Sequence, residues 1–112
     1  MTNFTKISKT FDHWLANLDE VSGWLYVSEK VSELRKDTLC HNICISNDIS
    51  LEEQNDSEIE ISNSGLIDVF ERADIEMVIS NLHQQVPSFS QEQCLEALNY
   101  YWKNNAYQNV AA

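Results

Sequence analysis

The sequence has few of the features that mark nucleotide-binding, membrane-spanning or exported proteins. It contains two glycines, Gly23 and Gly65, so the backbone has little means of cradling a phosphate group closely. No apolar run approaches the roughly 20 residues that a membrane-spanning helix needs. The segment from Met1 to Lys6 is not a charged leader followed by an apolar core, so no signal peptide is expected. These absences predict a cytoplasmic protein without a membrane partner.

The cysteines are three in number, and an odd count does not suit a small secreted domain held by disulfides. We therefore expect reduced thiols, as in a cytosol. Cys40, His41 and Cys44 include zinc-type ligands, but a structural zinc site needs four, and on a strand His41 points away from both cysteines. A calcium loop starting at Asp48 requires glycine where Glu53 stands. No metal or other cofactor is expected.

Catalytic motifs are also missing. His13, His41 and His83 occur without a companion nucleophile or base in a recognisable pattern, and the sequence has no nucleophile elbow, phosphate loop or dinucleotide fingerprint. We predict that the protein is not an enzyme.

What the sequence does have is negative charge in one place. It has 18 acidic and 7 basic residues, a net charge of -11 and a pI near 4.4. The charge exceeds the roughly 2–8 units that solubility asks of a small domain. Residues 1–36 are balanced, whereas residues 37–71 have no Lys or Arg. The acids of this middle segment are Asp37, Asp48, Glu52, Glu53, Asp56, Glu58, Glu60, Asp68 and Glu71. Such a segment repels nucleic acid and anionic membranes and attracts a basic protein.

The length and composition predict a single folded domain over residues 1–112. Hydrophobic residues make up 43% and aromatic residues 10%, which is enough for a core. Apolar residues at helical spacing predict a helix over 4–18. Aromatic content and alternation predict strands over 24–27, 38–46 and 58–61, with a loop over 48–57. Residues 28–36 fit either a loop or a short helix.

The last third of the sequence is typical of helices. Residues 66–70 fit a short helical turn, and residues 74–85 have an apolar stripe that ends before Pro87. Ser90 and Gln93 form a capping-box pair that begins a helix through Trp102, and an asparagine pair after it suits a C-terminal cap. The predicted fold is α+β, with a small antiparallel sheet of about three strands packed against about three helices.

The acidic segment is the best candidate for a binding surface. A loop and one strand face would present six carboxylates to a basic partner: Asp48, Glu52, Glu53, Asp56, Glu58 and Glu60. The alternative is a solvated loop, as charge runs usually are. Tyr100 and Tyr107 lie off the apolar stripe of the last helix, and exposed tyrosines often anchor interfaces. We predict these eight residues as the partner-binding set.

Several short segments carry a resemblance to a known class of protein. They are Trp24-Leu25-Tyr26, Asp37-Thr38-Leu39-Cys40, Ala97-Leu98-Asn99-Tyr100-Tyr101 and Asn104-Asn105-Ala106-Tyr107. With its size and acidic middle, the chain resembles the small immunity proteins that bacteria make beside contact-dependent growth inhibition toxins and other polymorphic toxins. These segments are also similar to bacterial domains that end in an aromatic, Asn-rich helix. The resemblance implies binding and neutralisation of a cognate toxin domain, often a nuclease, in the cytoplasm.

These observations leave two binding functions open. The first is an immunity protein that covers the basic active site of a toxin nuclease with its acidic surface. The second is an acidic mimic of nucleic acid that inhibits a restriction enzyme, a CRISPR effector or another DNA-binding protein. In both cases the partner is a basic protein, and the protein itself does not bind nucleic acid.

Overall fold

The sheet at the centre of the molecule is built from strands that lie far apart in the sequence. The computed structural model describes residues 3–110, so the ends of the predicted domain, residues 1–2 and 111–112, lie outside the described residues. The strands are β1 (Phe4–Thr10), β2 (Trp24–Ser28), β3 (Leu39–Ile45) and β4 (Leu66–Glu71). They form one antiparallel sheet in the order β1-β3-β2-β4. The predicted α+β class is thus confirmed, with four strands in place of about three.

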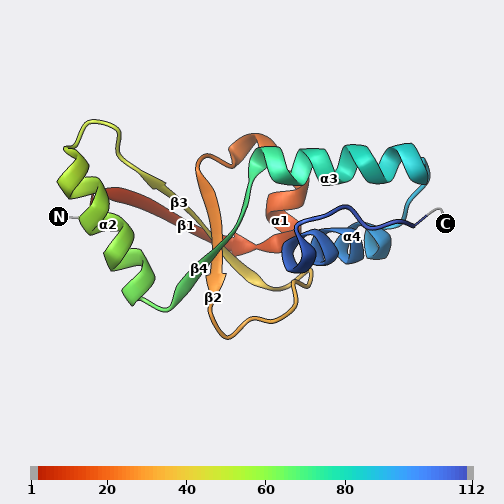
Figure 1. The fold of residues 1–112 in the computed structure, drawn as a ribbon, viewed down its shortest axis with the longest axis horizontal. Helices are drawn as coiled ribbons and strands as arrows, with labels where there is room; N and C mark the ends of the chain where they lie inside the picture. Colours follow the sequence, from red (N-terminus) through yellow and green to blue (C-terminus); the bar gives the residue numbers. More distant parts are fainter. Residues whose placement is uncertain (1–2, 111–112) are drawn as a thin grey trace.

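The helices gather at the two ends of an elongated molecule of 48 × 27 × 23 Å (Figure 1). They are α1 (Phe11–Ala16), the 3-10 turn η1 (Leu18–Glu20), α2 (Leu51–Asn63), α3 (Arg72–Gln85) and α4 (Gln91–Asn104). Figure 1 shows α3 and α4 beside the C-terminus and α2 at the opposite end, near the N-terminus. Within residues 3–110, no helix is both long and apolar enough to cross a lipid bilayer.

The main core lies between one face of the sheet and three helices. The buried residues are Phe11 and Trp14 of α1, Leu25 and Val27 of β2, Cys40 of β3, Phe70 of β4, Ile75, Val78 and Leu82 of α3, and Leu98 of α4. Ile43 and Ile61 are also buried but belong to the other side of the sheet, because Ile43 alternates with Cys40 and Asn42 along β3. Helix α2 therefore packs on the face opposite the main core.

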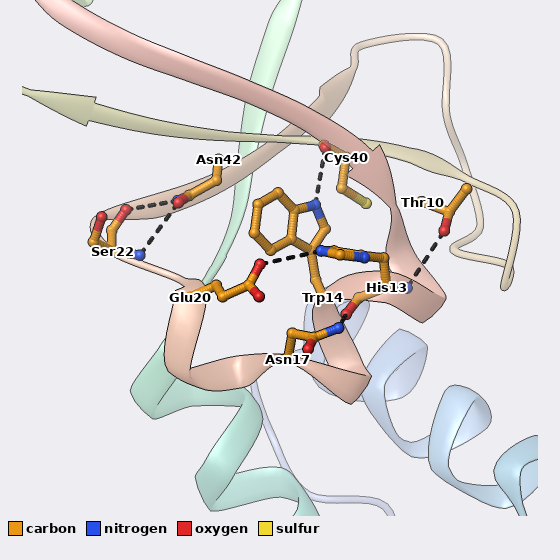
Figure 2. Close-up of polar contacts among 8 residues, drawn as sticks. All are labelled: Thr10, His13, Trp14, Asn17, Glu20, Ser22, Cys40 and Asn42. Carbon is orange, nitrogen blue, oxygen red and sulfur yellow. Dashed lines mark hydrogen bonds and ion pairs between the residues drawn. The ribbon is translucent and has the colours of Figure 1, made fainter.

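Polar contacts join α1 to the sheet (Figure 2). The buried Trp14 indole donates from Nε1 to the Cys40 carbonyl oxygen at 3.1 Å. Asn42, also buried, donates to the Ser22 carbonyl at 2.6 Å and accepts from the Ser22 amide at 3.3 Å. Buried polar groups need such partners, since an unpaired one costs about 1–3 kcal/mol. These contacts hold α1 and the residues just before β2 against β3.

The predicted helix over residues 4–18 is wrong in its first half. Residues 4–10 form the edge strand β1, paired with β3, and Ile7 is 50% exposed. The helix begins only at Phe11, because the Thr10 side chain accepts a hydrogen bond from the His13 amide as an N-cap. Helical spacing of apolar residues was present, but pairing with β3 outweighed it.

Three further predictions fail around the acidic segment. Residues 48–57 and 58–61, expected as a loop and a strand, are the turn before α2 and most of α2 itself. A strand would place Ile59 and Ile61 on one face, but Ile61 is buried and Ile59 is 55% exposed. Residues 66–70, expected as a helical turn, belong to β4, which pairs with β2. β-Branched and aromatic residues favour that strand.

The remaining elements agree with the predictions. β2, β3, α3 and α4 occur where alternation, the apolar stripes and the Ser90–Gln93 capping box indicate. Asn105 has the left-handed conformation of a C-terminal cap, with φ 51°. Of residues 28–36, for which the sequence fits either a loop or a short helix, Ser28 ends β2 and the others form a loop with isolated turns.

Candidate functional site: the acidic helix and its groove

The acidic segment forms a helix because of a local signal at its start. The Ser50 hydroxyl accepts from the Glu53 amide at 3.1 Å, and the Ser50 amide donates to the Glu53 carboxylate at 3.4 Å. This reciprocal capping box begins α2. Glu52 and Glu53 in the first turn also interact favourably with the positive end of the helix dipole. Asp48 lies in the turn just before the helix.

Helix geometry divides the five carboxylates of α2 among three directions. Ser57 and Ile61 mark the buried side of the helix. At about 100° per residue, Glu52, Asp56 and Glu60 form a row with about 6 Å between neighbours, which starts on the outward side at Glu52 and turns toward the flank of the helix at Glu60. Glu53 lies at one flank and Glu58 at the other. All five carboxylate side chains are exposed, so five of the six predicted acidic contacts occur on one helix.

These carboxylates have no basic neighbours at contact distance. The ion pairs among residues 3–110 are His13–Glu20, Glu33–Arg35 and Arg72–Glu76, and none involves α2. The helix itself has no Lys or Arg. Within the described residues, its negative charge is therefore not held in an internal ion pair. Such charge is available to a cationic partner without breaking an internal ion pair.

Large aliphatic side chains lie among these carboxylates. Leu51 is 82% exposed and Ile59 is 55% exposed. Ile59 lies on the outward side of the helix, about 20° round the helix from Glu52 and just beyond Asp56 along it, by the same 100° spacing. A surface that serves solubility alone gains nothing from these side chains, whereas a protein interface gains from burying them. The combination favours protein binding over a solvated helix.

A groove of about 630 Å³ lies between α2 and the sheet. Its walls include Trp24 and Tyr26 of β2, and its rim includes Glu58 of α2 and Asp68 of β4. Tyr26 and Asp68 are cross-strand partners. Burial, followed by the negative charges of Asp68 and Glu58, raises the pKa of Tyr26 above its ordinary value. The residues that line this groove include no Lys, Arg or His.

The predicted tyrosines belong to the other end of the molecule. Tyr100 and Tyr107 are 39% and 44% exposed. Tyr107 stacks on Tyr101 with ring centroids 5.6 Å apart, which holds it against the edge of the core. Tyr100 lines a groove of about 800 Å³ between α4 and the loop at 33–37. The structure therefore does not bring the tyrosines together with the acidic residues of α2 (Figure 1).

The groove beside Tyr100 differs from the α2 groove in its charge. Both signs line it, with Arg35, Lys36 and Lys103 opposite acids of the same loop and of α4. A mixed lining gives no preference for a cationic partner. The α2 end of the molecule is the better candidate for the partner surface.

Histidines form two polar pairs in the described part of the chain, and neither pair joins a nucleophile, a base and an orienting carboxylate. His13 is 3.2 Å from Glu20 (Figure 2), and His41 Nδ1 is 2.6 Å from the Ser8 hydroxyl. A serine bonded to a histidine is one part of a nucleophilic site, which also needs a group that orients the imidazole. Among residues 3–110, His41 has no carboxylate partner. Burial and the Lys6 charge lower the pKa of His41, which weakens it as a base.

Metal ligands do not gather in the described part of the chain. Among residues 3–110, no group of three or more His, Cys, Asp or Glu side chains is arranged to hold an ion. Cys40 is buried, and burial raises the pKa of its thiol to about 12. A metal-binding cysteine must lose its proton, so Cys40 is an inert core residue.

Sequence reasoning missed Trp24, Tyr26 and Asp68 as surface candidates. Trp24 and Tyr26 belong to a predicted strand, and alternation places them opposite Leu25 and Val27. Alternation indicates on which face of the sheet the two rings lie, but it does not show which other elements pack on that face. Asp68 was assigned to a helical turn, so its position beside Tyr26 could not be foreseen.

Comparison with known proteins gives one match. No curated protein and no solved structure matches the chain. The model of the DUF7716 family, described as a domain of unknown function, matches residues 8–110. This range includes all the helices, and the whole sheet except the first residues of β1. The chain is therefore a member of the DUF7716 family.

Proposed function

We propose that the protein is an immunity protein that binds a basic toxin domain, a nuclease, and neutralises it in the cytoplasm. The observation that carries the proposal is the outward side of α2. There, carboxylates without internal ion-pair partners surround the exposed Leu51 and Ile59. The resemblance of Trp24-Leu25-Tyr26 and the aromatic, Asn-rich end to immunity proteins supports the same role.

The proposed mechanism is occlusion of the toxin's active site. A nuclease binds phosphates through Lys and Arg side chains, which attract carboxylates equally well. The outward row of Glu52, Asp56 and Glu60 pairs with those cations, with Asp48 and Glu53 at the start of the helix. Burial of Leu51 and Ile59 excludes water from the contact. Close charge pairs across an interface couple by about 1.5–7 kcal/mol and accelerate association.

A charge reversal with a matched control tests this proposal. Glu52 and Glu92 occupy the same position of α2 and α4, the second residue after a serine N-cap with a capping box, and both are exposed. Glu52→Lys and Glu92→Lys therefore change the helix-dipole interaction equally. The proposed partner is a toxin domain encoded by a neighbouring gene, and the affinity of the complex is measured by calorimetry at several salt concentrations.

We expect Glu52→Lys to weaken the complex by at least tenfold and Glu92→Lys to leave it within twofold. The wild-type affinity is expected to fall with ionic strength. An affinity unchanged by Glu52→Lys would remove α2 from the interface and leave the end with Tyr100 and Tyr107 as the contact, whereas equal losses from the two reversals would mean attraction by net charge alone. Absence of any complex, or full toxin activity in its presence, would refute the immunity function.

A second candidate function is supported by the spacing of the outward row. Glu52, Asp56 and Glu60 repeat about every 6 Å along α2, and one strand of a DNA duplex has a phosphate every 3.4 Å of helix axis. Because the strand also winds round this axis, successive phosphates lie farther apart in space than the axial rise, so a row of this kind can occupy successive phosphate positions in a DNA-binding cleft. The protein would then inhibit a restriction enzyme, a CRISPR effector or another DNA-binding protein. A gene neighbourhood of phage or mobile-element type, in place of a toxin gene, would favour this candidate.

A further inference from the structure

The groove between α2 and the sheet has a lining that is selective for one kind of side chain. Its polar rim has Glu58 from α2 and Asp68 from β4, and its wall has the rings of Trp24 and Tyr26 from β2. The groove therefore brings together two acidic residues and two aromatic residues, with Asp68 beside Tyr26 on the sheet and Glu58 on α2. Without a cation in the lining, the carboxylates have no internal counter-charge there.

Tyr26 lies near both carboxylates of the groove. Asp68 is its cross-strand partner on β4, and Glu58 contributes to the electrostatic field at its hydroxyl from the helix side. Tyr26 and both carboxylates thus border the same groove. An acidic cluster alone would be a solvated patch, but here the acids border a hollow with aromatic walls.

We propose that this groove receives an arginine side chain of the basic partner, with the guanidinium between Glu58 and Asp68 and against the rings of Trp24 and Tyr26. The proposal rests on the proposed function, since it assumes a basic protein partner, and it names the side chain that the site selects. The occupant is argued from charge complementarity and from the aromatic walls.

Arginine fits this lining better than lysine does. A guanidinium is planar, stacks on aromatic rings and pairs with carboxylates through two parallel N–H donors. An ammonium group is a compact point charge that keeps its water more strongly. The volume of about 630 Å³ admits one long side chain with part of the main chain on either side of it.

The experiment uses blocked tripeptides, Gly-Arg-Gly, Gly-Lys-Gly and Gly-citrulline-Gly, titrated into the whole protein at 150 mM salt. Binding is followed by NMR through the indole N–H of Trp24, with the buried Trp14 indole as an internal reference. We expect the arginine peptide to bind at least fivefold more tightly than the lysine peptide and the citrulline peptide to show no saturable shift. Equal binding of arginine and citrulline peptides, or no shift of Trp24 with any peptide, would overturn the proposal.

Two double variants with the same change of net charge localise the effect. Glu58→Gln with Asp68→Asn removes the two carboxylates that line the groove, and Asp19→Asn with Glu92→Gln removes two exposed carboxylates outside the acidic helix. We expect the first to weaken the arginine peptide at least tenfold and the second to change it less than twofold. Equal losses would mean attraction by net charge alone and would overturn the groove as a specific site.

The outcome with the whole toxin domain separates this proposal from the proposed function. If the Glu58→Gln, Asp68→Asn variant binds the toxin normally while Glu52→Lys does not, the acidic helix is the interface and the proposal that the groove binds arginine is wrong. If neither variant weakens binding of the toxin domain, both the arginine proposal and the proposed mechanism of toxin binding are wrong. Thermal unfolding of each variant checks that the fold is intact.

Discussion

The side chain of Asn99 holds the backbone of Leu34 by two hydrogen bonds across 65 positions of sequence. The Leu34 amide donates to Asn99 Oδ1 at 2.7 Å, and Asn99 Nδ2 donates to the Leu34 carbonyl at 2.9 Å. Both residues are buried, at 9% and 2% exposure. This contact fastens the loop between β2 and β3 to α4 and so shapes the groove beside Tyr100.

Replacement of Asn99 by Ala is expected to destabilise the protein by about 2–3 kcal/mol, because it leaves the buried amide and carbonyl of Leu34 without partners. Urea unfolding measures the change. The control is Asn104→Ala on the same helix, where an exposed asparagine donates to the Tyr100 carbonyl at 3.0 Å. That loss is expected to stay below about 0.5 kcal/mol. Equal costs would show that the Leu34 contact is not a stabilising one.

The two glycines are expected to differ in their tolerance of a side chain. Both have positive φ, 72° at Gly23 and 81° at Gly65. A Cβ at Gly23 would lie 2.8 Å from the Ile43 carbonyl oxygen, which belongs to the sheet and cannot move easily, whereas the nearest atom to a Cβ at Gly65 is the flexible Glu29 carboxylate at 3.7 Å. We expect Gly65→Ala to cost about 1–2 kcal/mol from the backbone alone, and Gly23→Ala to cost more. A smaller loss for Gly23→Ala in thermal or urea unfolding would contradict the close approach.

The three thiols are expected to react at different rates in the folded protein. Burial raises the pKa of Cys40 to about 12 and also raises that of Cys94, so little thiolate exists at pH 8. Cys44 is partly exposed and lines the groove under α2. A brief pulse of iodoacetamide followed by mass spectrometry should modify Cys44 first, and all three in denaturant. Modification of Cys40 as fast as Cys44 would show that β3 opens readily.

The histidine on β3 is expected to make stability depend on pH. Burial first, and then the positive charge of Lys6, lower the pKa of His41 in the folded state, whereas the unfolded value is about 6.5. The unfolded state therefore takes up the proton first as pH falls. The contribution of His41 to stability is complete above about pH 6.5 and is lost progressively below it.

Comparison of the wild type with His41→Gln isolates this contribution from that of the carboxylates. Between pH 7 and pH 5, the free energy of unfolding should fall less in the variant. In NMR titrations, Lys6→Gln should raise the pKa of His41, because it removes the second cause of the shift. An unchanged pKa in that variant would leave burial as the whole cause.

Much of the C-terminal half could be predicted because its signals are local. The Ser90–Gln93 capping box, the stop before Pro87 and the left-handed Asn105 each act within one helical turn. A capping box of the same kind, Ser50 with Glu53, also begins α2. The sequence contains that signal, but the alternation of Glu58, Ile59, Glu60 and Ile61 favours a strand over the same residues.

The candidate site was predictable in its charge and not in its form. The sequence shows which residues are acidic and that no base lies among residues 37–71. It does not show that Glu58 meets Asp68 and Tyr26 across a groove, since that contact joins a helix to two strands. The exposure of Ile59 likewise follows from the helical conformation, because a strand would place Ile59 on the same face as the buried Ile61.

The sequence by itself determined the acidic character, the α+β class and the helices that begin and end at local caps. Tertiary structure decided that residues 4–10 form a strand, because an edge strand exists only where β3 offers it unpaired backbone groups. It also decided that α2 and the exposed tyrosines lie at opposite ends. Their separation follows from the strand order β1-β3-β2-β4 and from packing on opposite faces of the sheet. These depend on contacts between distant segments, which local patterns of residues do not encode.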